Sequence, residues 1–227
     1  MSQLLFPLPP PTVPIDGSDL VFPVRRIFCV GRNYAAHARE MGNDPTTEPP
    51  IFFMKPADAI VTDTRVPWPV DTANLHHEIE LVVALNSGGA NIDAARALDH
   101  IFGYAVGIDL TKRDRQGEAK DKGQPWERGK SFDASAPISA IFPAERIGHP
   151  TRGAIELSVN GARRQHGDLA DLILPVPQIV AKLSELWTLA AGDLIFTGTP
   201  EGVGAIKRGD VLAGGVAGVA RIEVTVG

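Results

Sequence analysis

Short apolar runs recur along the chain, each bounded by glycine, proline, asparagine or aspartate, and they predict a protein built mainly from β-strands. The runs that we expect to form strands are 27–30, 51–54, 78–85, 104–110, 155–160, 194–197 and 220–226. Two other segments have a helical pattern: 92–97, which Asn91 would open, and 177–187, where apolar residues repeat at helical spacing. The pattern therefore predicts an α+β protein in which strands dominate.

A third helix is predicted directly after the first strand. Gly31 ends that strand, and Asn33 comes next but one as a residue type that commonly caps helix N-termini. We expect a short helix from there to about Met41, so that strand, turn and helix succeed one another.

The N-terminal 25 residues differ from the rest in their proline content, which is concentrated in 5–14. Proline fixes φ and removes a backbone donor, so we expect 1–25 to form an extended arm over the surface. No repeat, heptad array or low-complexity linker divides the remaining residues. We therefore expect 26–227 to form a single catalytic domain.

Composition narrows the classes of partner. A net charge of -5, without runs of lysine or arginine, argues against nucleic acid. The apolar runs fall far short of the roughly 20 residues that cross a bilayer, so no membrane partner is expected. One cysteine, Cys29, cannot form an internal disulfide, and no secretory signal pattern opens the chain. These features predict a cytoplasmic protein.

Three carboxylates form the first candidate site. Glu78 and Glu80 lie two apart in a predicted strand and so point to the same face, while Asp109 comes after an apolar run at a strand end. Oxygen ligands of this kind suit hard divalent cations. The cations Lys112, Arg113 and Lys130 could balance the excess negative charge. The alternatives are two solvated glutamates on an exposed strand face and an aspartate that caps a turn.

His37 and Glu40 form the second candidate site, because residues three apart share one face of a helix. A histidine beside a carboxylate can act as a general base near neutral pH. The alternative is an incidental pair on an exposed helix face.

The third candidate is the glycine-rich segment 197–204, which comes directly after a predicted strand. Its glycines fit neither the dinucleotide fingerprint nor the P-loop. Backbone amides and the Thr199 hydroxyl could bind a substrate carboxylate. A simple turn between strands is the alternative.

Together and in this order, these segments resemble the fumarylacetoacetate hydrolase family from about Arg26 to the C-terminus. The matching segments are Gly31-Arg32-Asn33-Tyr34, His37-x-x-Glu40, Phe53-Met54-Lys55-Pro56, His77-Glu78-x-Glu80, Gly107-x-Asp109, Arg113-Asp114, Lys130-Ser131-Phe132-Asp133 and Thr197-Gly198-Thr199-Pro200-x-Gly202-Val203-Gly204. The chain is most similar to the acylpyruvate hydrolases, and its proline-rich start resembles fumarylpyruvate hydrolases of the gentisate pathway.

The resemblance implies a mixed β-sandwich roll with a few short helices, usually a homodimer. It also implies Mg²⁺ or Mn²⁺ bound by Glu78, Glu80 and Asp109. His37 and Glu40 would activate water, and Lys130 would stabilise developing negative charge. The residues that would line the substrate pocket are Arg113, Gln116, Lys130 and Thr199.

The implied reaction is hydrolysis of a carbon–carbon bond in a small dioxo acid, with fumarylpyruvate as the preferred substrate. Its second carboxylate would need a cation, for which Arg32, Arg39 and Lys55 are candidates. An oxaloacetate decarboxylase, or another oxo-acid lyase or isomerase of this fold, remains an alternative, since fold alone does not fix the reaction. A non-catalytic metal-stabilised binding module is the alternative of another class. Release of pyruvate from each substrate, with and without chelator, would separate the three.

Overall fold

The computed structural model describes residues 5–42, 44 and 50–227. None of its described helices is long and apolar enough to span a membrane. Two sheets form the body of the molecule. The six-stranded sheet has the order β12 (Phe142–Pro143), β9 (Ile101–Ile108), β8 (Ile79–Leu85), β15 (Asp193–Phe196), β3 (Arg26–Gly31) and β4 (Ile51–Lys55). The five-stranded sheet has the order β14 (Ala162–Asp168), β13 (Ala154–Val159), β17 (Val211–Val216), β18 (Ala220–Val226) and β6 (Arg65–Val66).

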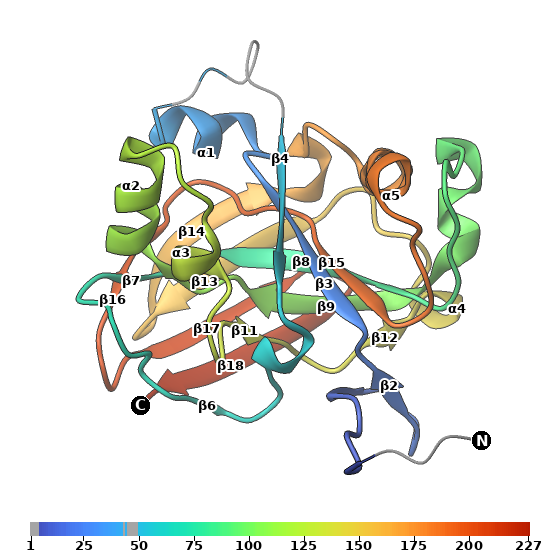
Figure 1. The fold of residues 1–227 in the computed structure, drawn as a ribbon, viewed down its shortest axis with the longest axis horizontal. Coiled ribbons are helices and arrows are strands. Elements are labelled where there is room, and N and C mark those ends of the chain that lie inside the picture. Colours follow the sequence, from blue (N-terminus) through green and yellow to red (C-terminus); the bar gives the residue numbers. More distant parts are fainter. Residues whose placement is uncertain (1–4, 43, 45–49) are drawn as a thin grey trace.

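Smaller sheets and short helices complete the described fold. The smaller sheets are β10 (Thr111–Lys112) with β7 (Leu75–His77) and β16 (Gly204–Ile206), β11 (Ala136–Pro137) with β5 (Ile60–Val61), and β1 (Thr12–Pro14) with β2 (Val21–Pro23). The α-helices are α1 (Ala35–Glu40), α2 (Arg113–Asp121), α3 (Glu127–Lys130), α4 (Ala144–Ile147) and α5 (Val176–Leu186). The 3₁₀ helices are η1 (Ala57–Ala59), η2 (Ala94–His100) and η3 (Leu169–Asp171). The strand-dominant α+β prediction is confirmed (Figure 1).

The central strand β8 separates two apolar layers, because its side chains alternate between the faces of the sheet. Ile79, Leu81 and Val83 belong to the larger core cluster, which includes residues of β13, β17 and β18 in the other sheet. Val82 and Ala84 belong to a second cluster on the opposite face. Glu80 alternates with Ile79 and Leu81 and so lies on the same face of β8 as Val82 and Ala84. Its carboxylate therefore points away from the layer between the two sheets.

Two helix starts differ from the sequence prediction. The N-cap of α1 is Tyr34 rather than Asn33, and it makes no side-chain capping bond. Asn33 is fully buried, and its amide instead bonds to backbone groups of Leu174 and Thr197. The segment predicted to begin at Asn91 is a 3₁₀ helix capped by Asp93, whose side chain accepts from the Ala95 amide. Asn33 thus satisfies backbone groups far along the chain instead of the helix start, whereas the second helix has an ordinary cap two residues later than predicted.

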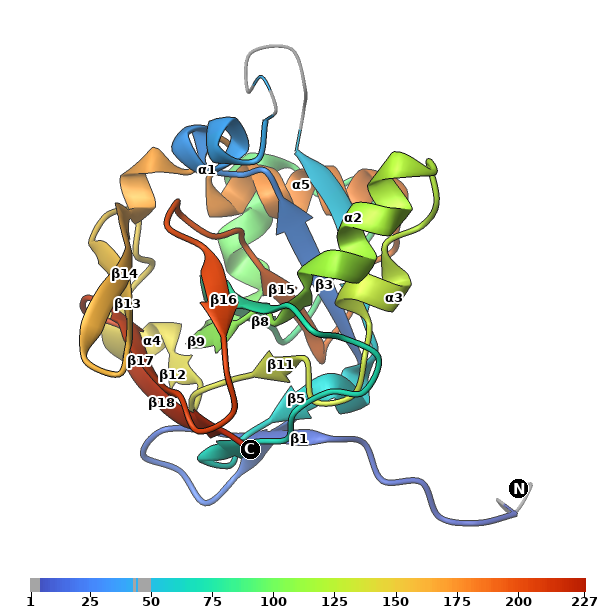
Figure 2. The ribbon, with the colours of Figure 1, turned by 90° about the vertical axis from the view of Figure 1, so that its left-hand side faces the viewer.

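The N-terminal stretch has two structural parts. Strands β1 and β2 pair as an antiparallel hairpin. Val13 and Phe22 of this hairpin are buried in the second core cluster. Residues 5–11 precede the hairpin and extend away from the body (Figure 2). Part of the expected arm therefore belongs to the packed core.

Candidate active site

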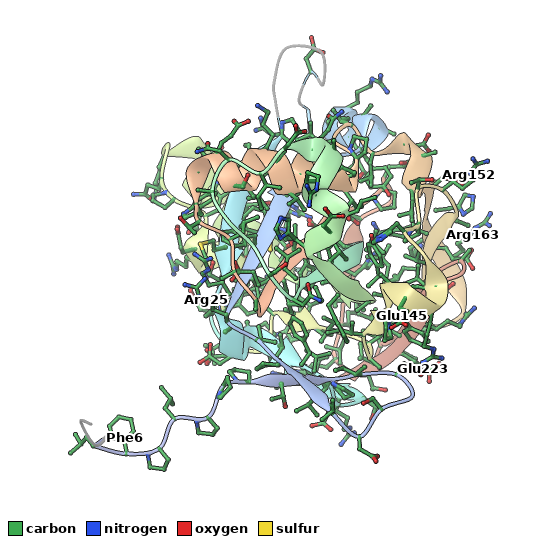
Figure 3. The ribbon with its side chains drawn as sticks, turned by 90° about the vertical axis from the view of Figure 1, so that its right-hand side faces the viewer. Phe6, Arg25, Glu145, Arg152, Arg163 and Glu223 are labelled. Carbon is green, nitrogen blue, oxygen red and sulfur yellow. The ribbon has the colours of Figure 1, made fainter. Side chains whose placement is uncertain are left out.

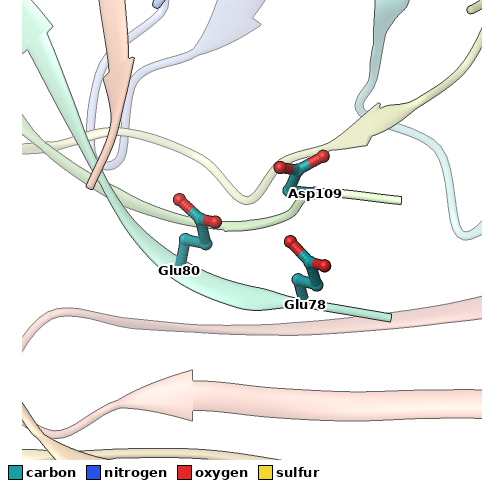
Figure 4. A group of neighbouring side chains, drawn as sticks. All are labelled: Glu78, Glu80 and Asp109. Carbon is teal, nitrogen blue, oxygen red and sulfur yellow. The ribbon is translucent and has the colours of Figure 1, made fainter. Parts of the chain in front are cut away.

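The three predicted carboxylates meet in one buried group. Glu78 precedes β8, Glu80 lies within it, and Asp109 comes directly after β9, which pairs with β8. One oxygen from each residue lies within 4.8 Å of the others (Figure 4). All three side chains are almost completely buried, and the Asp109 amide bonds to the Glu78 carbonyl at 2.8 Å. The pairing of β8 with β9 is what brings them together.

Three cations surround this acidic group. The Lys130 ammonium donates to Glu78 at 2.7 Å and to Asp109 at 2.6 Å, and its third bond goes to the Thr111 hydroxyl. The Arg113 guanidinium bonds to the other Glu78 oxygen. Lys55 lies 2.9 Å from Oδ1 of Asp109. These cations stabilise three carboxylates that would otherwise repel one another in a dry environment.

Burial and charge affect the two glutamates differently. Burial raises the pKa of Glu78, but Lys130 and Arg113 outweigh it and hold that pKa well below its usual range. The pKa of Glu80 is raised by burial and by the neighbouring carboxylates of Asp109 and Glu78. Glu80 accepts one hydrogen bond, from the Gly198 amide at 2.7 Å. Without a further cation, Glu80 therefore takes up a proton more readily than an ordinary glutamate.

The donor set fits a hard divalent cation. Oδ1 of Asp109 is a buried oxygen that makes no hydrogen bond of normal geometry, although Lys55 lies near it. The raised pKa of Glu80 marks a place where additional positive charge would be stabilising. Mg²⁺ and Mn²⁺ prefer carboxylate oxygens, so Glu78, Glu80 and Asp109 could hold either ion.

His37 and Glu40 form the predicted pair on α1. The Nδ1 atom of His37 lies 3.0 Å from Oε2 of Glu40, and the histidine is 7% exposed. Oε1 of Glu40 accepts from the Gly202 amide at 3.0 Å, a contact that the sequence did not predict. Since Glu40 fixes Nδ1, the Nε2 atom is the position at which His37 can accept a proton.

One cleft contains both the acidic group and His37. Its volume is about 420 Å³ including the open mouth. Residues that line it are Val30, Gly31, Arg32, His37, Met41, Phe53, Glu78, Glu80, Asp109, Arg113, Gln116, Lys120, Trp126, Lys130 and Thr199. Arg32, which lines the cleft, has a φ of 64°. This left-handed backbone conformation is uncommon outside glycine and is often found at functional sites. Arg113, Gln116, Lys130 and Thr199, which the family resemblance assigns to a substrate pocket, also line this cleft.

Three of the predicted cations, Lys55, Arg39 and Lys112, do not line the cleft. Lys55 is 1% exposed, and its ammonium bonds to the carbonyls of Leu110 and Lys130, so it lies behind Asp109 rather than on the cleft wall. Arg39 is on the exposed side of α1. Lys112 lies 4.6 Å from the centre of the Phe132 ring instead of beside the carboxylates. Of the three candidates for a distal carboxylate, Arg32 alone lines the cleft.

The glycine-rich segment supports the site through its backbone. Gly198 has a φ of 104°, and a side chain there would lie 2.8 Å from Cβ of Asn33. Its amide bonds to Glu80, while the Gly202 amide bonds to Glu40. Two amides of the segment predicted to bind a substrate carboxylate therefore hold protein carboxylates, and the segment joins the acidic group to the His37–Glu40 pair.

Gln165 is a positioning residue that the sequence did not indicate. It lies in β14, is completely buried, and its Oε1 accepts from the Ile79 amide at 3.0 Å and bonds to Nδ1 of His77 at 2.9 Å. Its Nε2 donates to the Thr199 hydroxyl at 2.8 Å and to the Pro200 carbonyl at 2.9 Å. Burial lowers the pKa of His77, so its neutral ring donates through Nδ1. Gln165 thus contacts both neighbours of Glu78, through the His77 ring on one side and the Ile79 amide on the other.

Replacing Gln165 with methionine, which has a similar volume and no amide, is expected to weaken Mn²⁺ binding by about 10- to 100-fold, the range for residues that orient metal ligands. Titration of free Mn²⁺ by electron paramagnetic resonance measures this without substrate. The exposed Gln124 supplies a matched control, since Gln124→Met alters no contact of the site. A Gln165→Met protein that is less stable but binds Mn²⁺ like the wild type would limit Gln165 to a structural role.

A β-rich roll with three buried carboxylates, balancing cations and a histidine–glutamate pair in one cleft is the architecture of an enzyme. Residues 26–227 match the family model described as the C-terminal domain of fumarylacetoacetate (FAA) hydrolase. The chain belongs to the fumarylacetoacetate hydrolase family.

Relatives within the family have different activities. The crystal structure of fumarylpyruvate hydrolase from Pseudomonas aeruginosa, in complex with Mn²⁺ and pyruvate, is 50% identical, with a TM-score of 0.97 over 99% of both chains. The oxaloacetate tautomerase YcgM of Escherichia coli is 44% identical over 87% of this chain and 90% of its own. The mitochondrial oxaloacetate tautomerase FAHD1 of Bos taurus is 43% identical over 89% and 91%.

Proposed function

We propose that the protein hydrolyses a carbon–carbon bond in an acylpyruvate, with fumarylpyruvate as the preferred substrate and Mg²⁺ or Mn²⁺ as cofactor. The observation that carries this proposal is the cleft shared by the His37–Glu40 pair and the acidic group, because hydrolysis needs a base for water beside the bound oxo acid. Similarity to a fumarylpyruvate hydrolase along nearly the whole chain supports the choice of substrate.

The residues divide the chemistry between them. A divalent ion held by the three carboxylates would supply positive charge for the carboxylate and keto oxygens of the pyruvyl end. His37, oriented by Glu40, takes a proton from water through Nε2 while the water oxygen forms a bond to the distal acyl carbon.

The bond between that acyl carbon and the pyruvyl methylene then breaks. Its electron pair leaves with the pyruvyl fragment as the enolate, which takes up a proton to give pyruvate, while the acyl part leaves as fumarate. Lys130 keeps Glu78 and Asp109 in place through its three bonds. Direct stabilisation of the enolate by Lys130 stays a prediction.

Oxaloacetate chemistry is the second candidate, and the two tautomerases at 43–44% identity favour it. Tautomerisation or decarboxylation of oxaloacetate proceeds through an enol or enolate but requires no attacking water. The two proposals therefore differ in product. Kinetics with fumarylpyruvate and oxaloacetate in separate assays test them: the hydrolase proposal predicts the higher kcat/KM for fumarylpyruvate, and the reverse order would favour oxaloacetate.

Arg32 is our candidate for the distal carboxylate of fumarylpyruvate, because it lines the cleft. A charge-assisted hydrogen bond contributes about 1.5–3 kcal/mol, which predicts a roughly 10- to 150-fold higher kcat/KM for fumarylpyruvate than for acetylpyruvate. Arg32→Gln is expected to narrow this ratio mainly through KM for fumarylpyruvate.

The exposed Arg39 provides the control, since Arg39→Gln removes the same charge from a neighbouring position outside the cleft wall. Equal kcat/KM for fumarylpyruvate and acetylpyruvate in the wild type would indicate an acylpyruvate hydrolase without a preference for the second carboxylate. If Arg32→Gln leaves the ratio of kcat/KM for fumarylpyruvate and acetylpyruvate unchanged, a residue other than Arg32 binds the distal carboxylate.

We also propose a reducing compartment such as the cytoplasm. The chain has a single cysteine, Cys29, and so cannot form the internal disulfides that are common in oxidising compartments.

A further inference from the structure

Exposed apolar side chains are concentrated at the N-terminus of the described chain. The large apolar side chains that remain exposed among residues 5–42, 44 and 50–227 are Leu5, Phe6, Leu8, Leu20, Val21, Val70 and Leu186. Five of these seven precede residue 22, and Leu5 is 95% exposed. A globular domain rarely leaves such a concentration of apolar surface in water unless it contacts a partner.

Residues 5–11 form an apolar, proline-rich segment that we call the N-terminal arm. It carries Leu5, Phe6 and Leu8 among prolines and no charged residue. Figure 3 shows Phe6 on the part of the arm that stands clear of the body. Prolines favour an extended polyproline II conformation before any contact is made, so docking such a segment costs little conformational entropy.

A groove elsewhere on the same chain has matching chemistry. Its volume is about 620 Å³ including the open mouth. Residues that line this groove, which we call the aromatic groove, are Pro67, Trp68, Pro69, Val70, Lys112, Phe132 and Asp133. Val70 is 83% exposed there. Grooves lined by aromatic side chains are a common receptor for proline-rich segments.

We propose that the N-terminal arm of one copy docks in the aromatic groove of a second copy of this chain. Docking within one chain is disfavoured, because residues 5–11 leave the body on the opposite side of Figure 1 from β6, which directly precedes the groove segment 67–70. In a two-fold dimer the arm of each copy would dock in the groove of the other, so that the same contact forms twice. Such reciprocal contacts are what two-fold symmetry requires.

The available area is sufficient for such a contact. One arm and one groove together present apolar surface on the order of several hundred Å², and using each twice approaches the roughly 1,200 Å² of a small specific interface.

The contact also has a consequence for the active site. In the groove, Lys112 directly precedes Arg113 in the chain, and Phe132 lies two residues after Lys130. A docked arm would therefore cover the segments that carry Arg113 and Lys130.

Cysteine crosslinking tests this contact directly. Leu8→Cys and Val70→Cys change exposed side chains, and the native Cys29 is buried and so does not compete. A protein with both substitutions, treated with a short bismaleimide at low concentration, is expected to give a covalent dimer on a denaturing gel. The matched control pairs Leu8→Cys with Leu186→Cys, whose side chain is exposed outside both surfaces. It should remain largely monomeric on the gel.

Sedimentation equilibrium provides the second measurement. Phe6→Ser with Leu8→Ser, and separately Val70→Asp, should raise the dimer dissociation constant about 10-fold or more, whereas Leu186→Ser should not. A mixture of the arm variant with the groove variant restores one of the two contacts and should associate more tightly than either variant alone. A monomeric wild type, a crosslink formed within one chain, or a dissociation constant unaffected by both variants would each overturn the proposal.

Discussion

Replacing His37 with glutamine is expected to lower the rate of acylpyruvate hydrolysis by ~10²- to 10⁴-fold, the usual contribution of a general base. Glu40→Gln should produce a loss of similar size, because the Glu40 carboxylate fixes the imidazole through a 3.0 Å contact with Nδ1. The two residues act as one base, so the double variant should lose little more than either single variant.

Measurement of kcat for the two single variants and the double variant checks this expectation. A double-variant loss equal to the product of the two single losses would contradict the paired base. Decarboxylation of oxaloacetate supplies an internal control, since loss of CO₂ needs neither an activated water nor a base to remove a proton from carbon. If the variants retain that activity while losing hydrolysis, the role of His37 in activating water is supported.

Glu80→Gln is expected to weaken Mn²⁺ binding by at least about 100-fold, more than the loss typical of residues that only orient a metal ligand. The substitution preserves shape but removes a charge from a group whose oxygens lie within 4.8 Å of Glu78 and Asp109. Activity should fall together with metal affinity and recover in part at high Mn²⁺ concentration.

The raised pKa of Glu80 supplies a second readout. Because its pKa is raised, Glu80 takes up a proton at a higher pH than an ordinary glutamate and then competes with Mn²⁺, so wild-type protein in weak buffer should release more protons on metal addition than Glu80→Gln. Metal affinity should accordingly fall as the pH decreases. Glu145→Gln changes an exposed glutamate on α4 and serves as the control. Full activity of Glu80→Gln after thorough chelation would contradict the metal assignment.

The fold was predictable where the apolar pattern is strong. The run 78–85 became β8, and the helical pattern at 177–187 became α5, one residue earlier. In contrast, α2 was missed because Arg113–Asp121 has hardly any apolar residues, and only Gln116 and Ala119 are buried. Strand β17 was missed because two glycines interrupt its apolar run. Tertiary contacts, not local pattern, determine these elements.

The site residues were predictable where their spacing in the sequence places them on one face of a strand or helix. Glu78, Glu80 and Asp109 came together as expected, because β8 and β9 pair along their length. The positions of Lys55 and Gln165 could not be inferred in this way. Gln165 contacts residues 86 and 34 positions away, and no local pattern indicates such pairs. Likewise, the Glu40–Gly202 bond spans 162 residues.

The most direct test of the proposed function is the metal dependence of product formation from fumarylpyruvate. The purified protein is treated with a chelator, supplied with Mn²⁺ or Mg²⁺ or neither, and assayed for pyruvate and fumarate. The proposal predicts equimolar pyruvate and fumarate with metal, and loss of both without it. Absence of both products in the metal-loaded protein, alongside rapid turnover of oxaloacetate, would contradict the proposal and favour oxaloacetate as the substrate.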